Sequence, residues 1–401
     1  MTRAPLNIFI LHPSDMLTDC LPHGDGLLAN LYIRKLAARG HSLHVAATNV
    51  QIEEASPSNV TIHKIDVPEP CTKPGSRIRY AFKVRALFRK LSTQAQFDLV
   101  HQLNPVVTGL ALSMVGIDKP IVMGPYVPDW PLVRRNNKLQ KPTLLQRVAR
   151  LAKQGFWYQQ HRMADKIILS SVAAMQKVPN RQQVDPKIHI IPYGIDVESF
   201  HPQELPTQRT ILFLAKVSYH KGIMVLLDAF RKVHETLPDV KLVVAGHGPE
   251  TELAQSVANT IGDGSAIQFI GKVDRANVPA CLQNCTVFCL PSYGEAFGMS
   301  VLEAMACGRA VVVTDDGGLR HIVTDKGGRK VPVADSQKLA EALVEIIQDP
   351  VLAQSMGTHN RKQVEERYAW DKVIDQIEAL YYQALPEVSV SRTVVCGPCA
   401  N

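Results

Sequence analysis

Two glutamates flank a glycine-bearing turn in the stretch PSYGEAFGMSVLEAMACG, residues 291–308. Seven residues separate Glu295 from Glu303, and an apolar helix is predicted to begin near Ser300. The free amides and the dipole at the start of such a helix favour an anion, and a carboxylate at position 303 can accept hydrogen bonds from two vicinal hydroxyls. Ser300-x-x-Glu303 also fits a helix capping box, which explains neither Glu295 nor the glycines.

Two lysines near the end of a predicted strand are candidates for binding a diphosphate. In LAKVSYHKG, Lys216 follows the strand and Lys221 precedes the next helix. A lysine ammonium attracts phosphate as a point charge. Considered alone, the two are better explained as ordinary surface lysines, because charged residues are mostly exposed.

Glycines follow other predicted strands, where they let a ligand approach the backbone closely. Gly246 and Gly248 end the strand in VVAGHGPE, although a plain tight turn is an equally simple explanation. Gly271 ends the strand in FIGKV, and the loop through Val273 can offer backbone groups to a flat base.

A glycine pair also lies in the first half of the chain. Gly24 and Gly26, in LPHGDGLLANL, separate the first predicted strand from its helix. Backbone amides at this position can face a phosphate or a sugar. A βα turn capped by Asp25 is almost as good an explanation.

Short β-branched strands alternate with amphipathic helices along the chain, which indicates parallel α/β sheets. The pattern restarts after a polar, proline-containing segment near residues 197–210. We therefore predict two Rossmann-like domains that face a cleft, because open α/β sheets bind ligands at the carboxyl ends of their strands. The predicted boundaries are 1–200, 201–370, a helix over 371–386 that packs back toward the first domain, and a disordered tail over 387–401.

The composition is that of an ordinary globular protein of 401 residues with a net charge of +7. The basic excess lies in the first half. No segment approaches the roughly 20 apolar residues that span a bilayer, and the apolar run near the N-terminus is too short for a signal peptide. We expect a cytoplasmic protein. The charge alone is weak support for nucleic-acid binding, and no motif adds to it.

Taken together, these motifs resemble the family 4 nucleotide-sugar glycosyltransferases, retaining enzymes of the GT-B fold. The resemblance extends over about residues 6–385 and is carried by the motifs quoted above together with IPYGID, VLEAMACG and VVVTDDGG.

The resemblance implies a role for each matching residue. The donor diphosphate would be held by Lys216 and Lys221, the ribose by Glu303, and the transferred sugar would lie at Glu295, which is the candidate catalytic residue. Further donor contacts would come from the following residues: Gly24, Gly26, Gly246, Gly248, Val273, Phe297, Gly298, Met299 and Ser300. Position 216 carries lysine where the family usually has arginine, so bidentate phosphate binding is lost there.

The first half departs from the family pattern. Many members have a histidine near the sugar where this chain reads VMGPYVPDW. The stretches HQLNP and MGP resemble a subset of the family whose comparable loops read His-Gln-x-Asn-Pro and Gly-Pro. This resemblance makes His101, Asn104 and Tyr126 candidate acceptor or sugar contacts. A strand-end histidine that is satisfied within the fold is an equally good explanation of His101.

The reaction implied by the resemblance transfers a sugar from a nucleotide diphosphate to a glycan, lipid-linked or small-molecule acceptor, with retention at the anomeric carbon. Stabilising the departing diphosphate is the main electrostatic task. The resemblance implies no metal, and the chain has no Asp-x-Asp motif. Two alternatives stay open, a sugar-nucleotide epimerase of the same fold and a catalytically silent nucleotide-sugar or glycan-binding protein.

One basic segment, residues 77–94, combines cations with apolar and aromatic residues. Its cations are Arg77, Arg79, Lys83, Arg85, Arg89 and Lys90. A helix of this kind can lie on the inner face of an anionic membrane, and a solvated face of a domain helix is the simpler interpretation.

Overall fold

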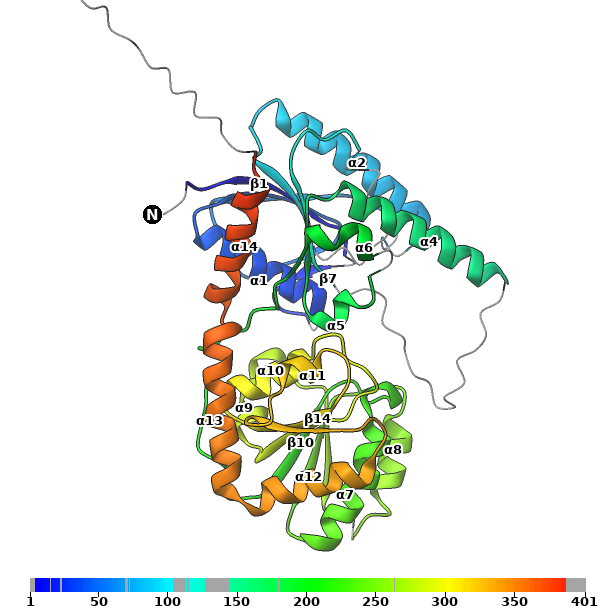
Figure 1. The fold of residues 1–401 in the computed structure, drawn as a ribbon, viewed down its shortest axis with the longest axis vertical. Coiled ribbons are helices and arrows are strands. Elements are labelled where there is room, and N and C mark those ends of the chain that lie inside the picture. Colours follow the sequence, from blue (N-terminus) through cyan, green and yellow to red (C-terminus); the bar gives the residue numbers. More distant parts are fainter. Residues whose placement is uncertain are drawn as a thin grey trace, which may run out of the picture.

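A computed structural model of the chain describes residues 4–14, 16–21, 24–68, 71, 73–103, 113, 115–126, 144–178, 181–262 and 264–386. The segment 387–401, which was predicted to be disordered, and Asn104 lie outside these residues. Figure 1 shows two α/β units, one above the other, with the C-terminal helices running along both.

The first unit is built on a seven-stranded parallel sheet in the order β5-β3-β1-β6-β7-β8-β9. A short pair, β2 with β4, lies outside this sheet. The helices and strands of the first unit are, in chain order, β1 (Asn7–His12), β2 (Leu17–Thr18), α1 (Gly24–Ala38), β3 (Ser42–Ala47), β4 (Val50–Gln51), β5 (Val60–Lys64), α2 (Pro74–Ser92), β6 (Leu99–Gln102), β7 (Ile121–Tyr126), α4 (Leu144–Met163), β8 (Lys166–Leu169), α5 (Val172–Met175), α6 (Arg181–Val184), η1 (Asp185–Lys187) and β9 (Ile188–Ile190).

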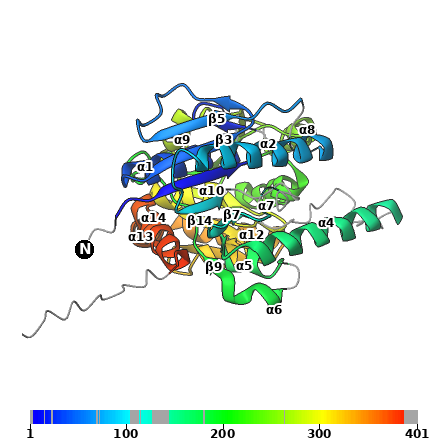
Figure 2. The ribbon, with the colours of Figure 1, turned by 90° about the horizontal axis from the view of Figure 1, so that it is seen from above.

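Both faces of this sheet are covered by helices. Successive residues of β1 point to opposite sides, so Ile8 and Ile10 pack with α1 and α14, whereas Phe9 and Leu11 pack with α2 and α4. Figure 2 shows the sheet from β5 and β3 at the top to β9 at the bottom, with α1 and α14 on its left side and α2 and α4 on its right. This burial on both faces explains the nearly continuous apolar runs of the strands.

The second unit has a six-stranded parallel sheet in the order β12-β11-β10-β13-β14-β15. Its elements are β10 (Thr210–Leu214), η2 (Tyr219–Lys221), α7 (Ile223–Thr236), β11 (Lys241–Ala245), α8 (Thr251–Ala258), β12 (Ile267–Gly271), η3 (Arg275–Asn277), α9 (Val278–Gln283), β13 (Val287–Leu290), α10 (Met299–Ala306), β14 (Ala310–Thr314), α11 (Leu319–Ile322), β15 (Gly328–Val331), α12 (Ser336–Gln348) and α13 (Pro350–Arg367). The two sheets make this a GT-B fold of two Rossmann-like domains.

The chain crosses between the two domains twice, and the crossings are bonded to each other. The amide of Ile195 donates to the carbonyl of Tyr368 at 2.8 Å, and the amide of Trp370 donates back to Ile195 at 3.3 Å. After the second crossing, α14 (Trp370–Ala384) packs on the first domain, where Trp370 and Tyr381 are buried. The last helix therefore belongs to the core of the N-terminal domain.

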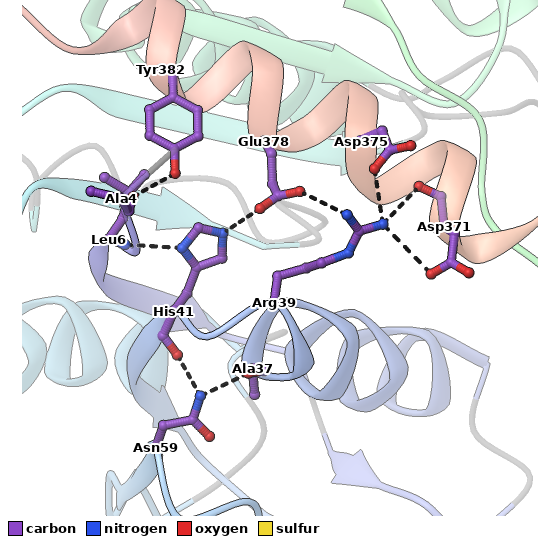
Figure 3. Close-up of polar contacts among 10 residues, drawn as sticks. All are labelled: Ala4, Leu6, Ala37, Arg39, His41, Asn59, Asp371, Asp375, Glu378 and Tyr382. Carbon is purple, nitrogen blue, oxygen red and sulfur yellow. Dashed lines mark hydrogen bonds and ion pairs between the residues drawn. The ribbon is translucent and has the colours of Figure 1, made fainter. Parts of the chain in front are cut away.

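Polar contacts add to this packing of α14, as Figure 3 shows. The Leu6 amide donates to His41 Nδ1 at 3.0 Å, so the other ring nitrogen carries the proton and donates to Glu378, also at 3.0 Å. Arg39 extends the contact with ion pairs to Asp375 at 2.8 Å and to Glu378 at 3.5 Å. These contacts fix α14 against the end of α1.

His101 is part of the same junction and is fully buried. Its Nε2 lies 2.6 Å from the carbonyl oxygen of Gly124, which only accepts, so Nε2 carries the proton. Nδ1 then accepts from the hydroxyl of Tyr381 on α14, also at 2.6 Å. Both ring nitrogens are therefore used within the fold, as expected for a satisfied strand-end histidine.

Buried histidines should make the fold sensitive to acid. Burial lowers the pKa of His101 and of His161 to about 4 from 6.5. Between pH 6.5 and 4 these two histidines bind protons in the unfolded chain but not in the folded chain, so the free energy of unfolding falls as the pH falls. We expect each histidine to cost about 2 kcal/mol of unfolding free energy at pH 5 relative to pH 7.

Urea unfolding at pH 7 and pH 5 measures this effect. Between the two pH values the variant His101→Gln should lose less unfolding free energy than the parent protein, and the difference should be about the 2 kcal/mol expected for one histidine. An identical pH dependence in both proteins would contradict the burial of a neutral His101.

Candidate active site

The candidate residues of the C-terminal domain lie where its strand order reverses. The chain runs outward from β10 to β11 and β12, and then returns to β13 on the other side of β10. Ligands of open α/β sheets bind at such a switch point, beside the carboxyl ends of the strands. Lys216 and Lys221 follow β10, and Glu295 follows β13, so the fold brings the two loops to one place.

Glu295 and Lys221 form an ion pair across this point. Lys221 Nζ lies 2.5 Å from Glu295 Oε2, and the two side chains are 25% and 17% exposed. A charge-assisted bond of this kind is among the stronger hydrogen bonds in proteins. The structure therefore joins a candidate phosphate-binding cation to the candidate catalytic carboxylate, although 74 residues separate them in the chain.

The second lysine is placed differently. Lys216 is exposed, and among the residues that the structure describes it makes no hydrogen bond or ion pair. It can turn toward a ligand at the end of β10 at a cost in side-chain entropy only.

The start of α10 differs from the capping box that Ser300 and Glu303 allow in sequence. Gly298 is the N-cap, with a positive φ of 94°, and no side chain caps the helix. A Cβ at position 298 would lie 2.4 Å from Leu319 Cδ2, so a larger residue would have to displace that side chain as well as adopt the left-handed conformation. Met299 and Ser300 form the first turn and are half-buried, and their position is consistent with amides that meet an anion.

Glu303 faces Arg275 instead of its own helix terminus. Its side chain is 8% exposed and forms an ion pair with Arg275 Nη1 in η3. Burial raises the pKa of Glu303, and the guanidinium of Arg275 opposes this by lowering it. The capping-box interpretation of Glu303 is therefore wrong, and the carboxylate is turned toward the loop after β12.

The glycines after β11 have a structural explanation. A Cβ at Gly246 would lie 1.9 Å from the carbonyl oxygen of Ala215, and one at Gly248 would lie 2.1 Å from that of Val217. The loops after β10 and β11 thus pack backbone against backbone, which explains glycine at both positions, and a contact of either glycine with the donor stays a prediction. Gly271 has a φ of 70°, and Val273 is half-buried against the core at the same end of the sheet.

Two family models match the chain, one in each domain. The model described as Glycosyltransferase Family 4 matches residues 29–199, and the model described as Glycosyl transferases group 1 matches residues 196–363. A phosphatidyl-myo-inositol mannosyltransferase of Mycolicibacterium smegmatis is 30% identical over 324 residues, which cover 79% of this chain and 78% of that protein. The chain belongs to glycosyltransferase family 4.

More distant relatives agree with this assignment. The MMP alpha-(1->4)-mannosyltransferase of Mycolicibacterium hassiacum is 25% identical over 354 residues, covering 85% of this chain and 81% of that enzyme. Among solved structures, sucrose-phosphate synthase from Thermosynechococcus elongatus aligns with a TM-score of 0.69 at 20% identity, covering 94% and 98% of the two chains. Anabaena HepE in complex with UDP has the same TM-score at 18% identity, covering 94% and 100%. These structures share the fold of this glycosyltransferase.

The structure also places three of the N-terminal candidates of this family 4 chain. Gly24 and Gly26 do not form a loop, because α1 already begins at Gly24, and Gly26 is buried in its first turn. Asp25 is likewise inside the helix and is not its cap. The buried His101 offers no free ring nitrogen, so it is not a substrate contact in this conformation. Tyr126 ends β7, and its side chain lies outside the described part of the chain.

Phe297 also has a structural role. It is 4% exposed and packs edge-to-face on Tyr193, with ring centroids 5.2 Å apart, and on Tyr368, at 6.3 Å. Both tyrosines flank the crossings between the domains. Phe297 therefore packs the Glu295 loop against the two domain crossings, and a direct donor contact through its ring is not supported.

Sequence reasoning missed Arg275 and Ser171. The Ser171 hydroxyl, at the end of β8, donates to the carbonyl of Ala296 at 2.7 Å and accepts from the Ala174 amide at 3.0 Å. It thereby links the N-terminal domain to the residue after Glu295. No motif marks either residue, because each acts through a partner that is far away in the sequence.

Proposed function

We propose that this glycosyltransferase moves a sugar from a nucleoside-diphosphate sugar to an acceptor alcohol, with retention at the anomeric carbon. The contact between Lys221 and Glu295, beside the uncapped start of α10, is the observation that carries the proposal. It puts a cation, free helix amides and a carboxylate at the switch point, which are the groups needed by a departing diphosphate and a reacting sugar.

In this proposal the donor diphosphate meets the amides of Met299 and Ser300 and the ammonium of Lys221, with Lys216 reaching in from the end of β10. The negative charge that develops on the leaving oxygen is stabilised by these groups, and we expect no metal requirement. When phosphate binds, Lys221 shares its charge between phosphate and Glu295. The Glu295 carboxylate is then free to face the positive charge that builds up on the sugar ring.

For the acceptor, we propose a phosphatidylinositol-type lipid, and for the sugar, mannose. The support is the activity of two relatives that match most of the chain, which are phosphatidyl-myo-inositol mannosyltransferases in M. smegmatis and in Mycobacterium tuberculosis. The latter is 28% identical, covering 86% of this chain and 89% of that enzyme.

A lipid acceptor requires contact with a membrane, and α2 offers a surface for it. No helix within the described residues is long and apolar enough to cross a bilayer. On α2, however, Ile78 is 48% and Phe82 is 67% exposed, beside the exposed cations Arg79, Arg89 and Lys90. We propose that this face lies on an anionic membrane surface, where apolar burial and charge attraction act together.

The remaining cations of the segment serve the fold. Arg77 Nε donates to the Cys71 carbonyl at 3.1 Å, and Lys83 Nζ donates to the Asp66 carbonyl at 2.7 Å. Arg85 also donates to a backbone carbonyl. Only part of the basic segment is therefore available to a membrane.

Removing the exposed apolar pair tests the membrane contact. The double variant Ile78→Ser/Phe82→Ser should fold normally and lose most of its binding to vesicles of phosphatidylcholine and phosphatidylinositol, with a drop of about tenfold or more. Co-sedimentation with the vesicles at low salt measures this. A control is Val351→Ser, a residue 79% exposed on α13 of the other domain. Equal vesicle binding by parent and double variant would remove α2 from the proposal.

The donor site itself is tested by calorimetric titration with UDP, GDP, ADP, CMP and dTDP, without added metal. Preferential binding of one diphosphate supports the proposal and selects the sugar nucleotides to assay. Binding of none of them contradicts a donor site at α10.

A further inference from the structure

Arg275 occupies a position between the domain linker and α10. Its guanidinium lies 4.7 Å from the ring centre of Phe200, a residue that is 2% exposed in the linker after the first crossing. The same guanidinium pairs with Glu303 on α10 through a single nitrogen, Nη1. Stacking and ion pairing together hold a side chain that is otherwise 41% exposed.

The contact matters because Glu303 is a buried carboxylate. A charged group taken out of water is costly unless it is paired and hydrogen-bonded. Among the residues that the structure describes, Arg275 is the one side chain that bonds to the Glu303 carboxylate. Burial raises the pKa of Glu303, and the positive charge of Arg275 opposes this rise, which favours the carboxylate form that accepts hydrogen bonds.

We propose that Arg275 is a positioning residue for the donor nucleotide, and that it acts on the ribose through Glu303. This inference rests on the proposed function. Nη1 bonds to Oε1 only, which leaves Oε2 for a hydroxyl of the ribose. An arginine has no acceptor of its own, so it fixes the carboxylate without competing for its role.

The chain of contacts has a consequence for ligand specificity. Phe200 fixes Arg275, Arg275 fixes Glu303, and Glu303 faces the sugar hydroxyls of the nucleotide. Glu303 accepts a hydrogen bond from one ribose hydroxyl in this proposal. Loss of Arg275 should therefore weaken the binding only of nucleotides that carry this hydroxyl. An arginine that touched the base or the diphosphate directly would act on deoxyribonucleotides equally.

The test compares UDP with 2′-deoxy-UDP and GDP with 2′-deoxy-GDP by calorimetry, on the full chain. The parent protein should prefer the ribonucleotide by about tenfold or more, as expected for a hydrogen bond to a charged group. In Arg275→Gln and in Glu303→Gln this preference should fall to nearly one. Combining the two substitutions should add no further loss, because both remove the same contact.

Two further variants guard against an indirect loss of structure. Arg275→Lys keeps the charge and should retain part of the preference. Arg329→Gln removes a half-buried arginine that pairs with Glu345 in the same domain, and it should leave the preference unchanged.

Equal losses for the ribonucleotide and its deoxy counterpart in Arg275→Gln would overturn the inference in favour of a direct contact. A parent protein that binds both forms equally would overturn the assignment of Glu303 to the ribose. Binding of neither form by the parent protein would overturn the donor site itself, and this inference with it.

Discussion

The variant Glu295→Ala should bind nucleoside diphosphates nearly normally and lose sugar transfer by on the order of a thousandfold. Nucleotide binding should persist because the negative charge of Glu295 can only repel the phosphates. Removing Glu295 also frees Lys221 to face the diphosphate. Transfer should fail because no carboxylate remains beside the reacting sugar. Calorimetry with the diphosphate and an assay of diphosphate release measure the two effects separately.

The control for Glu295 is a carboxylate that also pairs with a cation, but far from the switch point. Glu345 on α12 pairs with Arg329 on β15, so Glu345→Gln should retain full transfer. The isosteric variant Glu295→Gln tests whether charge is the cause, and it should be as inactive as the alanine variant. Retained turnover in either Glu295 variant would remove this residue from the reaction.

The variant Lys221→Met should weaken binding of the nucleoside diphosphate about 100-fold, and it should reduce transfer by at least as much. Methionine fills a similar volume without the ammonium, so the Glu295 side chain loses its partner and the phosphate loses a cation. The affinity for the nucleoside without phosphates should stay unchanged, because Lys221 acts on the diphosphate alone.

Lys216→Met provides the matched comparison for Lys221. Lys216 is exposed and makes no described contact, so a smaller loss of about tenfold or less is expected. Equal effects of the two substitutions would indicate a diffuse positive field. A loss of nucleoside affinity in Lys221→Met would show instead that the site has been distorted.

The fold was largely predictable from the sequence, because buried strands of parallel sheets carry apolar runs. The strands placed at the ends of LAK, VVAG and FIG correspond to β10, β11 and β12, and the alternation of strands and helices corresponds to two Rossmann-like domains. The edge strands β5 and β15 were not predicted. Their sequences, VTIHK and GRKV, are short and polar, because an edge strand is covered less completely by the helices.

The candidate site was predictable only in part. Glu295 and Glu303 stand out because of their spacing around a glycine turn. Their partners could not be predicted, since Lys221 and Arg275 reach them only through the folding of separate loops. The capping-box alternative for Glu303 fails for the same reason, because helix α10 begins at a glycine and the carboxylate turns to a different loop.

The surroundings of the N-terminal candidates could not be predicted from the sequence. His101 lies in a strand whose end resembles a ligand-binding loop, but its partner is Tyr381, which is 280 residues away on a helix that returns to the first domain. Gly24 and Gly26 lie in the first turn of α1, where a helix leaves free amides, and their contact with the donor stays a prediction.

Product formation tests the central claim of sugar transfer most directly. The protein is incubated without added metal with GDP-mannose and with UDP-glucose, in the presence and absence of phosphatidylinositol vesicles, and nuclear magnetic resonance follows the anomeric proton. The account predicts diphosphate release that depends on the acceptor, and a product with the anomeric configuration of the donor. An isomerised nucleotide sugar formed without acceptor, an inverted product, or no reaction despite donor binding would contradict it.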